Sequence, residues 1–409
     1  MSPDAPPSLA LRALSAQARL RLETLPPLSL YLHFPWCLRK CPYCDFNSHA
    51  LQGELPEADY VAALLADLEM ALPAIWGRRV LTVFLGGGTP SLFSPAAIAT
   101  LLSGLRARLA GLPGAEITLE ANPGTFEAER FQGYREAGVT RLSLGVQSFD
   151  EAKLAALGRV HGAREAHAAA ASAVQIFPAT NFDLMFALPG QNEAAALADV
   201  DAALAYAPQH LSCYHLSIEP NTWFARHPPV LPDGDAAAAI EDAVRVRLAA
   251  AGFLHYEVSA HARPGFLCRH NLNYWRFGDY LGLGAGAHGK ISFPDRILRQ
   301  TRARSPKDYL AAVAAGRPVE GAHEVAARDL GFEFALNALR LKQGVPLALF
   351  AERTGLTPAA LLPALSAARA RGLLVSDPLR LVATPLGQRF LDDLVGLFLP
   401  EATSSATSN

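Results

Sequence analysis

The chain has 409 residues, which is more than one ordinary hydrophobic core holds, so we expect two domains. Its residues are 51% hydrophobic and 18% charged, a composition that excludes an intrinsically disordered protein. The formal net charge of −2 excludes binding of nucleic acid by bulk electrostatics, although it leaves a local basic patch open.

The N-terminal segment, residues 1–28, is predicted to be an extension outside the folded domains. Arg12, Arg19 and Arg21 lie there among alanine, serine, leucine and proline. This composition partly resembles that of an organellar transit peptide, but we favour a frayed extension of a bacterial protein. The segment lacks the charged start and continuous apolar stretch of a secretory signal, and no later apolar run is long enough to cross a bilayer.

Between residues 29 and 252, short apolar segments typical of strands alternate with longer helical patterns. The predicted strands are Leu30–Phe34, Val80–Leu85, Ala115–Glu120, Arg141–Val146, Asn181–Phe186 and Leu211–Ile218. The predicted helices cover about residues 57–72, 95–110, 126–137, 151–174, 192–206 and 235–251. Six strand–helix units of this kind predict a parallel sheet, either open or curled. The fold class that we expect is α/β, with a partial (β/α)6 barrel over residues 29–252.

Polar and glycine residues gather where the predicted strands end. The first strand runs into the cysteines at residues 37–44, and the second into Gly86–Pro90. The third and fourth end at Glu120–Pro123 and at Gln147 with Ser148. Asp183 lies in the fifth strand, and Glu219 follows the sixth. The carboxyl ends of parallel strands meet at one edge of the sheet, which is where such folds place their chemistry. The sequence therefore predicts a single site built from many strands.

The alternation breaks at about residue 253, and residues 253–324 are predicted to form a connecting segment. Residues 325–396 are rich in alanine and leucine and end in a short hairpin pattern, which predicts a smaller helical, winged-helix-like C-terminal domain. Residues 397–409 are predicted to be a disordered tail. A winged-helix module usually suggests DNA binding, but the low charge supports a lid or packing role at least as well.

Three of the five cysteines, Cys37, Cys41 and Cys44, fall within eight positions directly after the first strand. An odd, crowded set of cysteines argues against disulfides and for a metal or cluster in a reducing compartment, so we expect a cytoplasmic protein. Thiolates suit iron–sulfur clusters or zinc. Three ligands from one loop leave one iron of a [4Fe-4S] cluster open. Zinc would need a fourth ligand, His33 or His49, and zinc cysteines usually come as two close pairs.

The sequence around these cysteines, Tyr31-Leu-His-Phe-Pro-Trp-Cys37-Leu-Arg-Lys-Cys41-Pro-Tyr-Cys44, resembles the signature of radical S-adenosylmethionine (SAM) enzymes. Within them it resembles the HemN-like branch, which includes the oxygen-independent coproporphyrinogen III oxidases. The resemblance continues into the C-terminal module and covers nearly the whole chain. The segment His270-Asn-Leu-Asn-Tyr-Trp275 is similar to that of HemW-type heme chaperones. One departure stands out, because the oxidases carry a fourth cysteine at the position of Phe46.

The resemblance implies a set of ligand contacts. It implies that the three cysteines hold a [4Fe-4S] cluster whose open iron takes the amino and carboxylate groups of SAM. It implies a first SAM molecule at Tyr31, Gly87 and Glu120, and a second at Gly88, Thr89, Gln147, Arg159 and Asp183. Without the resemblance, the glycines would serve a tight turn or the close approach of a ligand to the backbone. Arg159 would be either a fork for a carboxylate or a solvated helix arginine.

His270 has two interpretations. It is either packed beside Tyr274 and Trp275 and hydrogen-bonded to the backbone, or an axial heme ligand flanked by aromatic side chains that cover the porphyrin. The resemblance favours the heme ligand. Cys213 and Cys268 are more typical of small core residues than of ligands.

The function implied by the resemblance is that of a heme chaperone, which binds heme and a SAM-coordinated [4Fe-4S] cluster and delivers heme to acceptors such as respiratory cytochromes. The second hypothesis is a radical SAM oxidoreductase that acts on a porphyrinogen. Phe46 argues against coproporphyrinogen dehydrogenase activity, and no catalytic residue is assigned. A nucleic-acid partner is not expected. Dimer formation and transient membrane association stay open.

Overall fold

The structure is a computed structural model that describes residues 20–124 and 129–400. The predictions for residues 1–19, for the start of the helix at 126–137 and for the tail at 401–409 lie outside the described residues. No described helix is long and apolar enough to cross a membrane.

One sheet of twelve strands runs through the described part of the chain, in the order β14-β13-β12-β11-β1-β4-β5-β6-β7-β8-β10-β9. Six neighbouring strands pair in parallel, and each begins within two residues of its predicted start. They are β1 (Leu28–Phe34), β4 (Val80–Gly87), β5 (Glu116–Ala121), β6 (Arg141–Gln147), β7 (Ala179–Phe186) and β8 (His210–His215). The predicted α/β class and partial barrel are confirmed.

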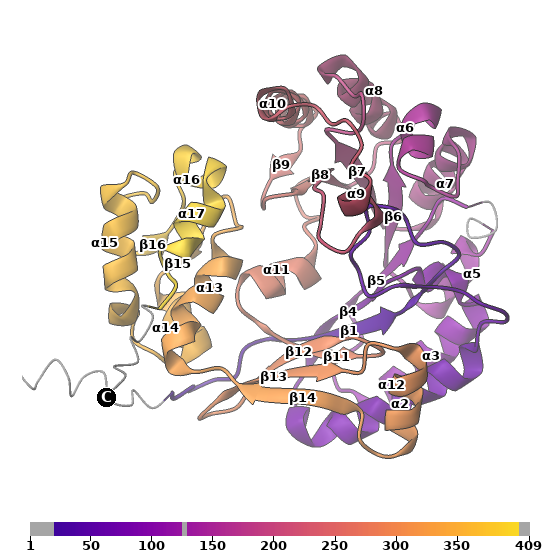
Figure 1. Ribbon diagram of the computed structural model, residues 1–409. Helices are drawn as coiled ribbons and strands as arrows, with labels where there is room; N and C mark the ends of the chain where they lie inside the picture. Colours follow the sequence, from indigo (N-terminus) through magenta and orange to yellow (C-terminus); the bar gives the residue numbers. More distant parts are fainter. Residues whose placement is uncertain (1–19, 125–128, 401–409) are drawn as a thin grey trace, which may run out of the picture.

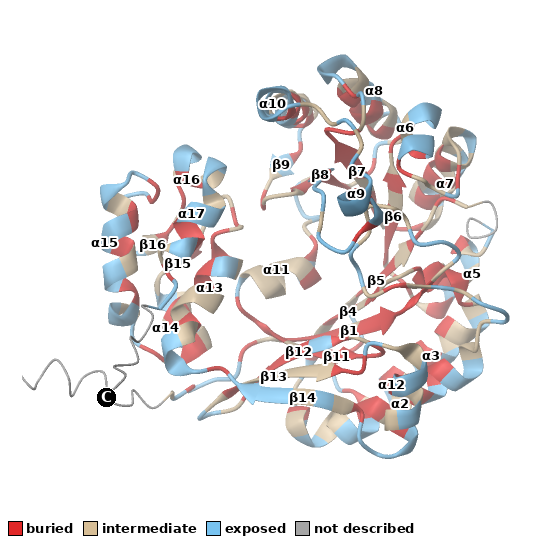
Figure 2. Cartoon of the chain, in the orientation of Figure 1, coloured by how far each residue is buried: buried red, intermediate tan, exposed pale blue. Residues whose placement is uncertain are grey.

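Helices connect these strands and pack side by side on the outside of the curved sheet (Figure 1). They are α2 (Glu57–Ile75), α3 (Pro95–Arg108), α5 (Phe131–Ala137), α6 (Glu151–Ala156), α7 (Ala163–Ile176), α8 (Glu193–Leu204) and α10 (Gly234–Ala250). The strands are buried almost throughout, whereas the helices turn polar faces outward (Figure 2). This is the burial expected of a parallel sheet that is covered on one face by helices and curves round an interior on the other.

Two boundaries differ from the sequence prediction. The single helix predicted at residues 151–174 is two helices, α6 and α7, because the chain turns at Gly158, which has a φ of 64° that favours glycine. The sixth strand ends at His215 rather than Ile218. Beyond it the chain turns into a short helix, α9 (Trp223–Arg226), whose N-cap Thr222 accepts a hydrogen bond from the amide of Ala225.

Residues 253–324 extend the sheet at both edges, which the sequence did not predict. On one edge are β9 (Leu254–His255) and β10 (Ala260–Ala262); on the other are β11 (Asp279–Leu283), β12 (His288–Ser292), β13 (Ile297–Arg302) and β14 (Val319–Glu324). Strand β11 pairs in parallel with β1, whereas β12, β13 and β14 follow as antiparallel neighbours. Helix α12 (Pro306–Ala314) packs against α2. Helix α11 (Arg269–Trp275) links the two edges and lies between the barrel and the C-terminal region (Figure 1).

The C-terminal region is helical and has a core of its own, built around Phe334 and Phe350. It contains α13 (Leu330–Ala338), α14 (Ala348–Thr354), α15 (Leu362–Ala370), α16 (Pro385–Arg389) and α17 (Leu391–Gly396), with a small antiparallel pair of β15 (Val345–Pro346) and β16 (Arg380–Leu381). The tail prediction begins too early, because Phe398 is buried in this core. Leu20, inside the predicted extension of residues 1–28, also packs there. Apart from these ends, the division into domains stays a prediction.

Candidate functional site

The described residues enclose a cavity of about 590 Å³ inside the barrel, open at the carboxyl ends of its strands. Every residue that was predicted to hold a ligand lines this one cavity: Tyr31, Cys37, Cys41, Cys44, Gly87, Gly88, Thr89, Glu120, Gln147, Arg159, Asp183 and His270. Phe46, Tyr274 and Trp275 line it as well. The structure therefore brings together residues from five barrel strands, from the cysteine loop and from α11. Which ligand each residue contacts stays a prediction.

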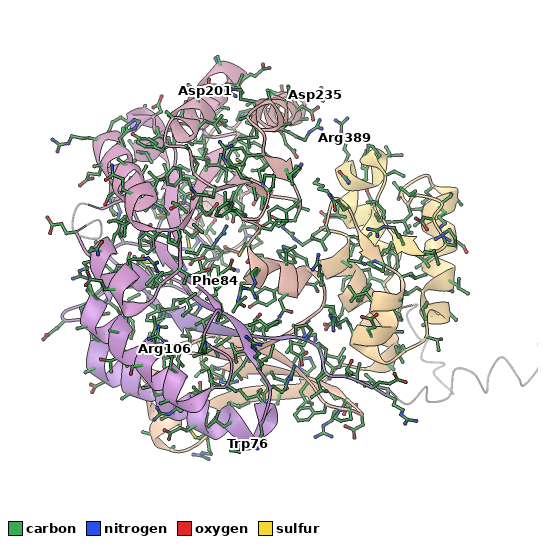
Figure 3. The ribbon with its side chains drawn as sticks, turned by 180° about the vertical axis from the view of Figure 1, so that it is seen from behind. Trp76, Phe84, Arg106, Asp201, Asp235 and Arg389 are labelled. Atoms are coloured by element: carbon green, nitrogen blue, oxygen red, sulfur yellow. The ribbon has the colours of Figure 1, made fainter. Side chains whose placement is uncertain are left out.

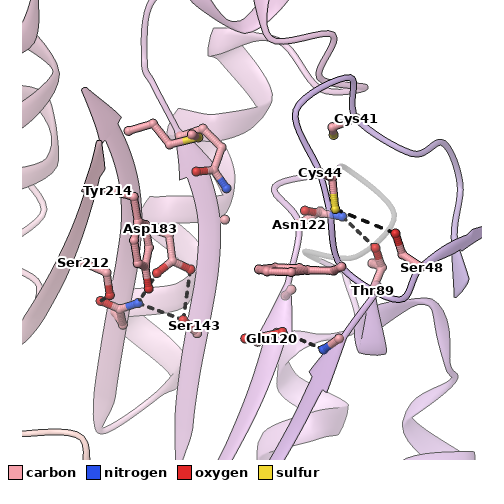
Figure 4. Close-up of a pocket in the computed structure, with 18 of the residues that line it drawn as sticks. Cys41, Cys44, Ser48, Thr89, Glu120, Asn122, Ser143, Asp183, Ser212 and Tyr214 are labelled. Carbon is pink, nitrogen blue, oxygen red and sulfur yellow. Dashed lines mark hydrogen bonds between the residues drawn. The ribbon is translucent and has the colours of Figure 1, made fainter. Parts of the chain in front are cut away.

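The cysteine loop is fixed at both of its ends. Cys37 closes the short strand β2 (Trp36–Cys37), which pairs with β3 (His49–Ala50) and so draws the loop between them into a compact turn. Each thiol lies near a hydroxyl or guanidinium group. Thr89 Oγ1 donates to Cys37 Sγ over 3.4 Å, and Arg159 Nη1 lies 3.5 Å from Cys41 Sγ. Ser48 Oγ lies 3.8 Å from Cys44 Sγ (Figure 4). Such donors stabilise a thiolate that ligates a metal.

Without a metal, burial raises the pKa of the Cys37 and Cys44 thiols. A positive centre in the loop would reverse this effect, because a coordinated thiol is deprotonated. The two proposed fourth zinc ligands are engaged elsewhere. His33 bonds Tyr31 through Nδ1 and the carbonyl of Asn47 through Nε2, and His49 Nε2 lies 3.2 Å from the carbonyl of Arg304. These contacts argue against zinc.

Among the described residues there is no group of three or more His, Cys, Asp or Glu side chains placed to hold a single metal ion. A four-iron cluster does not need its three thiolates to meet at one metal ion, since each thiolate binds a different iron. The donor set of three cysteines, with a guanidinium beside them, fits such a cluster.

The glycines after β4 allow two chain segments to touch. A Cβ on Gly88 would lie 2.6 Å from the carbonyl oxygen of Trp36, and Gly87 has a φ of 114°. The amides of this turn are already used, since Gly88 N–H donates to Phe34, Thr89 N–H to Trp36 and Gly87 N–H to Glu120. All three N–H groups are therefore hydrogen-bonded within the protein. The glycines position the cysteine loop against β4.

Two partly buried carboxyl groups face the cavity, Glu120 from β5 and Asp183 from β7. Burial and the nearby charge of Asp183 raise the pKa of Glu120 to about 8, while the bond from Gly87 N–H opposes the rise. Burial also raises the pKa of Asp183, against hydrogen bonds from Asn181 and Ser143. Figure 4 shows Asp183 and Ser143 on one side of the cavity and Glu120 nearer the cysteines. Both carboxyl groups thus hold their protons to a higher pH than usual, and a cationic ligand beside them would favour their ionised form.

Arg159 is not a solvated helix arginine. It lies in the turn after α6, and its Nη2 donates to Asn122 Oδ1 over 2.7 Å and to the carbonyl of Gly145 over 2.8 Å. Its Nε is buried without a partner among the described residues. The guanidinium therefore lies between the cysteine loop and the strand ends. Gln147 is held with a φ of 68° at an irregularity between β6 and β7, a conformation of the kind that concentrates at functional sites.

His270 is almost completely buried, and burial lowers its pKa to about 3. Its Nδ1 lies 2.8 Å from Thr82 Oγ1, and the Thr82 hydroxyl donates its proton to Ser29. The imidazole must therefore donate from Nδ1, which leaves Nε2 as a lone pair. Nε2 has no partner among the described residues. The ring packs on Phe84, with centroids 4.9 Å apart, and Phe84 is seen beside α11 in Figure 3.

Sequence reasoning missed several cavity residues. Thr82, Asn122, Arg141 and Asn181 are not among the predicted site residues, yet Asn122, Arg141 and Asn181 line the cavity and Thr82 orients His270. The sequence did carry a signal for these residues. Polar residues fall on every second position of the predicted strands, and such residues share one face of the sheet, here the inner one. Of the other candidates, Cys268 lines the cavity. Cys213 and His261 are buried but do not line it.

Comparison with known proteins shows which family the chain is related to. The model of the radical SAM superfamily matches residues 31–203, and that of the HemN C-terminal domain matches residues 325–390. The chain is 52% identical to the heme chaperone HemW of Escherichia coli, over 92% of this chain and 99% of the relative. It is 47% identical to the heme chaperone HemW of Haemophilus influenzae, over 93% and 100%. The chain belongs to the HemW family.

A solved structure shows the same fold. Coproporphyrinogen III oxidase (HemN) from Escherichia coli, described as a radical SAM enzyme, superposes with a TM-score of 0.78 over 95% of this chain and 98% of the other, at 21% identity. In this HemW-family chain the cysteines and the proposed SAM residues fall inside the radical SAM match. His270 falls between the two family matches, in the segment that extends the sheet.

Proposed function

We propose that this HemW-family chain binds heme in the barrel cavity beside a SAM-coordinated [4Fe-4S] cluster, and passes the heme to acceptor proteins. The observation that carries the proposal is the Nε2 lone pair of His270, buried, unprotonated and without a partner among the described residues. A histidine that ligates a metal typically donates its other ring N–H to a neighbour, and Thr82 takes that role here. The relatives named as heme chaperones at 52% and 47% identity support the same function.

The cavity suits a planar apolar ligand. Its volume of about 590 Å³ lies within the range of about 300–1,000 Å³ for small-molecule sites. Phe84, Tyr274 and Trp275 supply aromatic walls around His270. Apolar faces of this kind bury a macrocycle, while the imidazole fixes the position of its iron.

The cluster end of the cavity has its own set of residues. When bound, the cluster would supply an open iron for the amino and carboxylate groups of SAM and an electron for its cleavage. Cys37, Cys41 and Cys44 would hold the cluster, and Arg159 would balance the thiolate charge. Tyr31, Gly87 and Glu120 would contact one SAM molecule. Gly88, Thr89, Gln147 and Asp183 would contact a second.

The alternative function is a radical SAM oxidoreductase that acts on a porphyrinogen. The common fold with coproporphyrinogen III oxidase favours it, but a likeness at 21% identity carries the fold alone. Phe46 argues against it, because its side chain is 63% exposed at the cavity mouth and offers no thiol where the oxidases carry one. We also propose that the protein acts in the cytoplasm and that heme acceptors such as respiratory cytochromes are its partners.

The test is parallel measurement of heme binding and decarboxylation in the anaerobically reconstituted protein. We expect a heme absorption band on titration with heme, and no release of carbon dioxide from coproporphyrinogen III with SAM and reductant present. His270→Ala should change the heme spectrum. His261→Ala is the matched control, since that histidine is equally buried but lies outside the cavity. Decarboxylase turnover by the wild type would overturn the proposal. A heme spectrum that changes only in His261→Ala would identify His261, not His270, as the heme ligand.

A further inference from the structure

Arg141 is a buried cation whose charge lowers the pKa of Asp183 without a direct ion pair between the two side chains. It opens β6, is only 2% exposed and lines the cavity. Its Nη1 donates to the carbonyl of Phe266 over 3.1 Å, whereas its Nη2 is buried with no hydrogen-bond partner. No ion pair to Arg141 is formed by any described carboxylate. Burying a charge without an ion pair costs free energy, and an arginine cannot avoid that cost by losing its proton.

Asp183, whose pKa the charge of Arg141 lowers, and Glu116 are hydrogen-bonded to other groups. Asp183 accepts from Ser143 and Asn181. Glu116 accepts from the His270 amide and from the thiol of Cys268. Asp183 therefore offsets the charge of Arg141 without bonding to it, and Nη2 of the guanidinium has no hydrogen-bond partner among the described residues.

Arg141 belongs to the same inner surface as His270. Strand register places Phe84 beside Thr118, and Thr118 beside Arg141, in one row across β4, β5 and β6. His270 packs on the Phe84 end of this row. The Thr118 hydroxyl, in the middle of the row, is also buried without a partner. A ligand that reached His270 would thus lie along a row that ends in an unpaired guanidinium and includes an unpaired hydroxyl.

The row is remote from the cysteines. Arg141 begins the strand that Gln147 ends, and six residues of strand span about 20 Å. A SAM molecule whose carboxylate is bound at the cluster would therefore keep that carboxylate at the opposite end of the cavity. A carboxylate for Arg141 therefore comes from another ligand of the cavity, either the proposed second SAM molecule or the ligand that His270 contacts.

We propose that Arg141, assisted by Thr118, binds a carboxylate of the ligand that His270 contacts, a propionate of the heme. This inference rests on the proposed function. An arginine fork matches a carboxylate with two parallel N–H···O bonds, and burial removes competition from water. The porphyrin is then fixed at its metal and at its acidic edge. A porphyrin without a charged carboxylate at this edge would leave the Arg141 guanidinium unpaired, so it would bind more weakly.

The test pairs a ligand change with a residue change in the reconstituted protein. Heme and heme dimethyl ester are titrated into the wild type, Arg141→Gln and Arg141→Lys, with iron and sulfide content and thermal midpoint checked for each. We expect Arg141→Gln to bind heme about 10- to 100-fold more weakly, the range for a hydrogen bond to a charged group. The wild type should bind the ester more weakly by a similar factor, and the wild type and Arg141→Gln should bind the ester equally. Arg269→Gln, at the exposed start of α11, is the control for long-range charge and should bind heme normally.

Three outcomes would overturn the inference while leaving the proposed function in place. They are equal heme affinity in Arg141→Gln, equal loss for heme and ester, and wild-type binding of the ester as tight as that of heme. Weaker SAM binding with unchanged heme binding would assign the carboxylate to SAM instead. If Arg141→Gln does not fold, the wild-type ratio of heme to ester and the Arg141→Lys variant decide the matter. A wild type that binds neither form of heme would overturn the proposed function itself.

Discussion

Replacing Glu120 with glutamine should stabilise the metal-free protein at neutral pH. Burial and Asp183 raise the pKa of this carboxyl to about 8 from 4.5. Between these two values the folded chain binds the proton and the unfolded chain does not. Stability therefore falls as the pH rises from about 4.5 to about 8. At about 1.36 kcal/mol per pH unit, the loss reaches about 1 kcal/mol at pH 5.5 and about 3 kcal/mol at pH 7.

Glutamine removes this loss and keeps the main local contact. Its amide oxygen can accept the N–H of Gly87, which donates to Glu120 over 3.0 Å. Urea unfolding of the metal-free wild type and of Glu120→Gln at pH 5.5 and pH 7 measures the effect. We expect the variant's advantage in the free energy of unfolding to grow by about 2 kcal/mol between the two pH values.

The matched control is Glu69→Gln, which removes an exposed carboxylate paired with Arg108. Surface pairs of this kind contribute about 0–1 kcal/mol, so this variant should show no comparable dependence on pH. The reasoning about Glu120 fails if its variant keeps the wild-type pH dependence, or if it is less stable at pH 7. SAM affinity should be lower in Glu120→Gln, because glutamine, unlike Glu120, cannot ionise when a cationic ligand binds beside it.

Three further predictions concern the cluster loop and His270. Cys41→Ser should abolish the iron–sulfur absorption after reconstitution, whereas Cys213→Ser should retain it, because Cys213 is buried outside the cavity. Full iron and sulfide content in Cys41→Ser would show that Cys41 is not a ligand. Gly88→Ala should lower the free energy of unfolding by about 1–3 kcal/mol, because its Cβ meets the carbonyl of Trp36 at 2.6 Å, and Gly234→Ala, with open space around it, should not. Thr82→Val should weaken heme binding about 10-fold or more and change the heme spectrum, since Nδ1 of His270 loses its acceptor; an unaltered spectrum would show that Thr82 does not orient the ring.

The barrel was predictable because its information is local. Apolar strand segments placed six strands to within two residues of their starts, and the repeated strand–helix unit predicted that the strands are parallel. Gly158 was misjudged because a glycine within an alanine-rich helical pattern is tolerated as often as it breaks the helix. The strands of residues 253–324 were missed because their pairing is long-range. Strand β11 finds β1 about 250 residues away, and nothing in its own five residues specifies that partner.

The candidate site divides in the same way. The cysteines could be found from their spacing, and the proposed SAM residues from the resemblance to radical SAM enzymes. The roles of Thr82 and Arg141 depend on what faces them across the barrel, which neither residue's neighbours in sequence reveal. The use of the Gly87, Gly88 and Thr89 amides within the protein also needed coordinates, because a glycine-rich turn has the same sequence whether it approaches a ligand or another strand.

Helix α11 explains why the segment after the barrel matters to the cavity. Its contacts run to the first half of the sheet: His270 to Thr82 on β4, Asn273 to Ser29 on β1, and the His270 amide to Glu116 on β5. A carboxylate at a helix start stabilises the helix, so Glu116 fixes α11 at its N-terminus. These bonds hold a seven-residue helix, too short to be stable alone, against the open side of a partial barrel. His270 is therefore positioned by strands that also carry the cluster loop, and heme and cluster would be held by one rigid frame from opposite ends of the cavity.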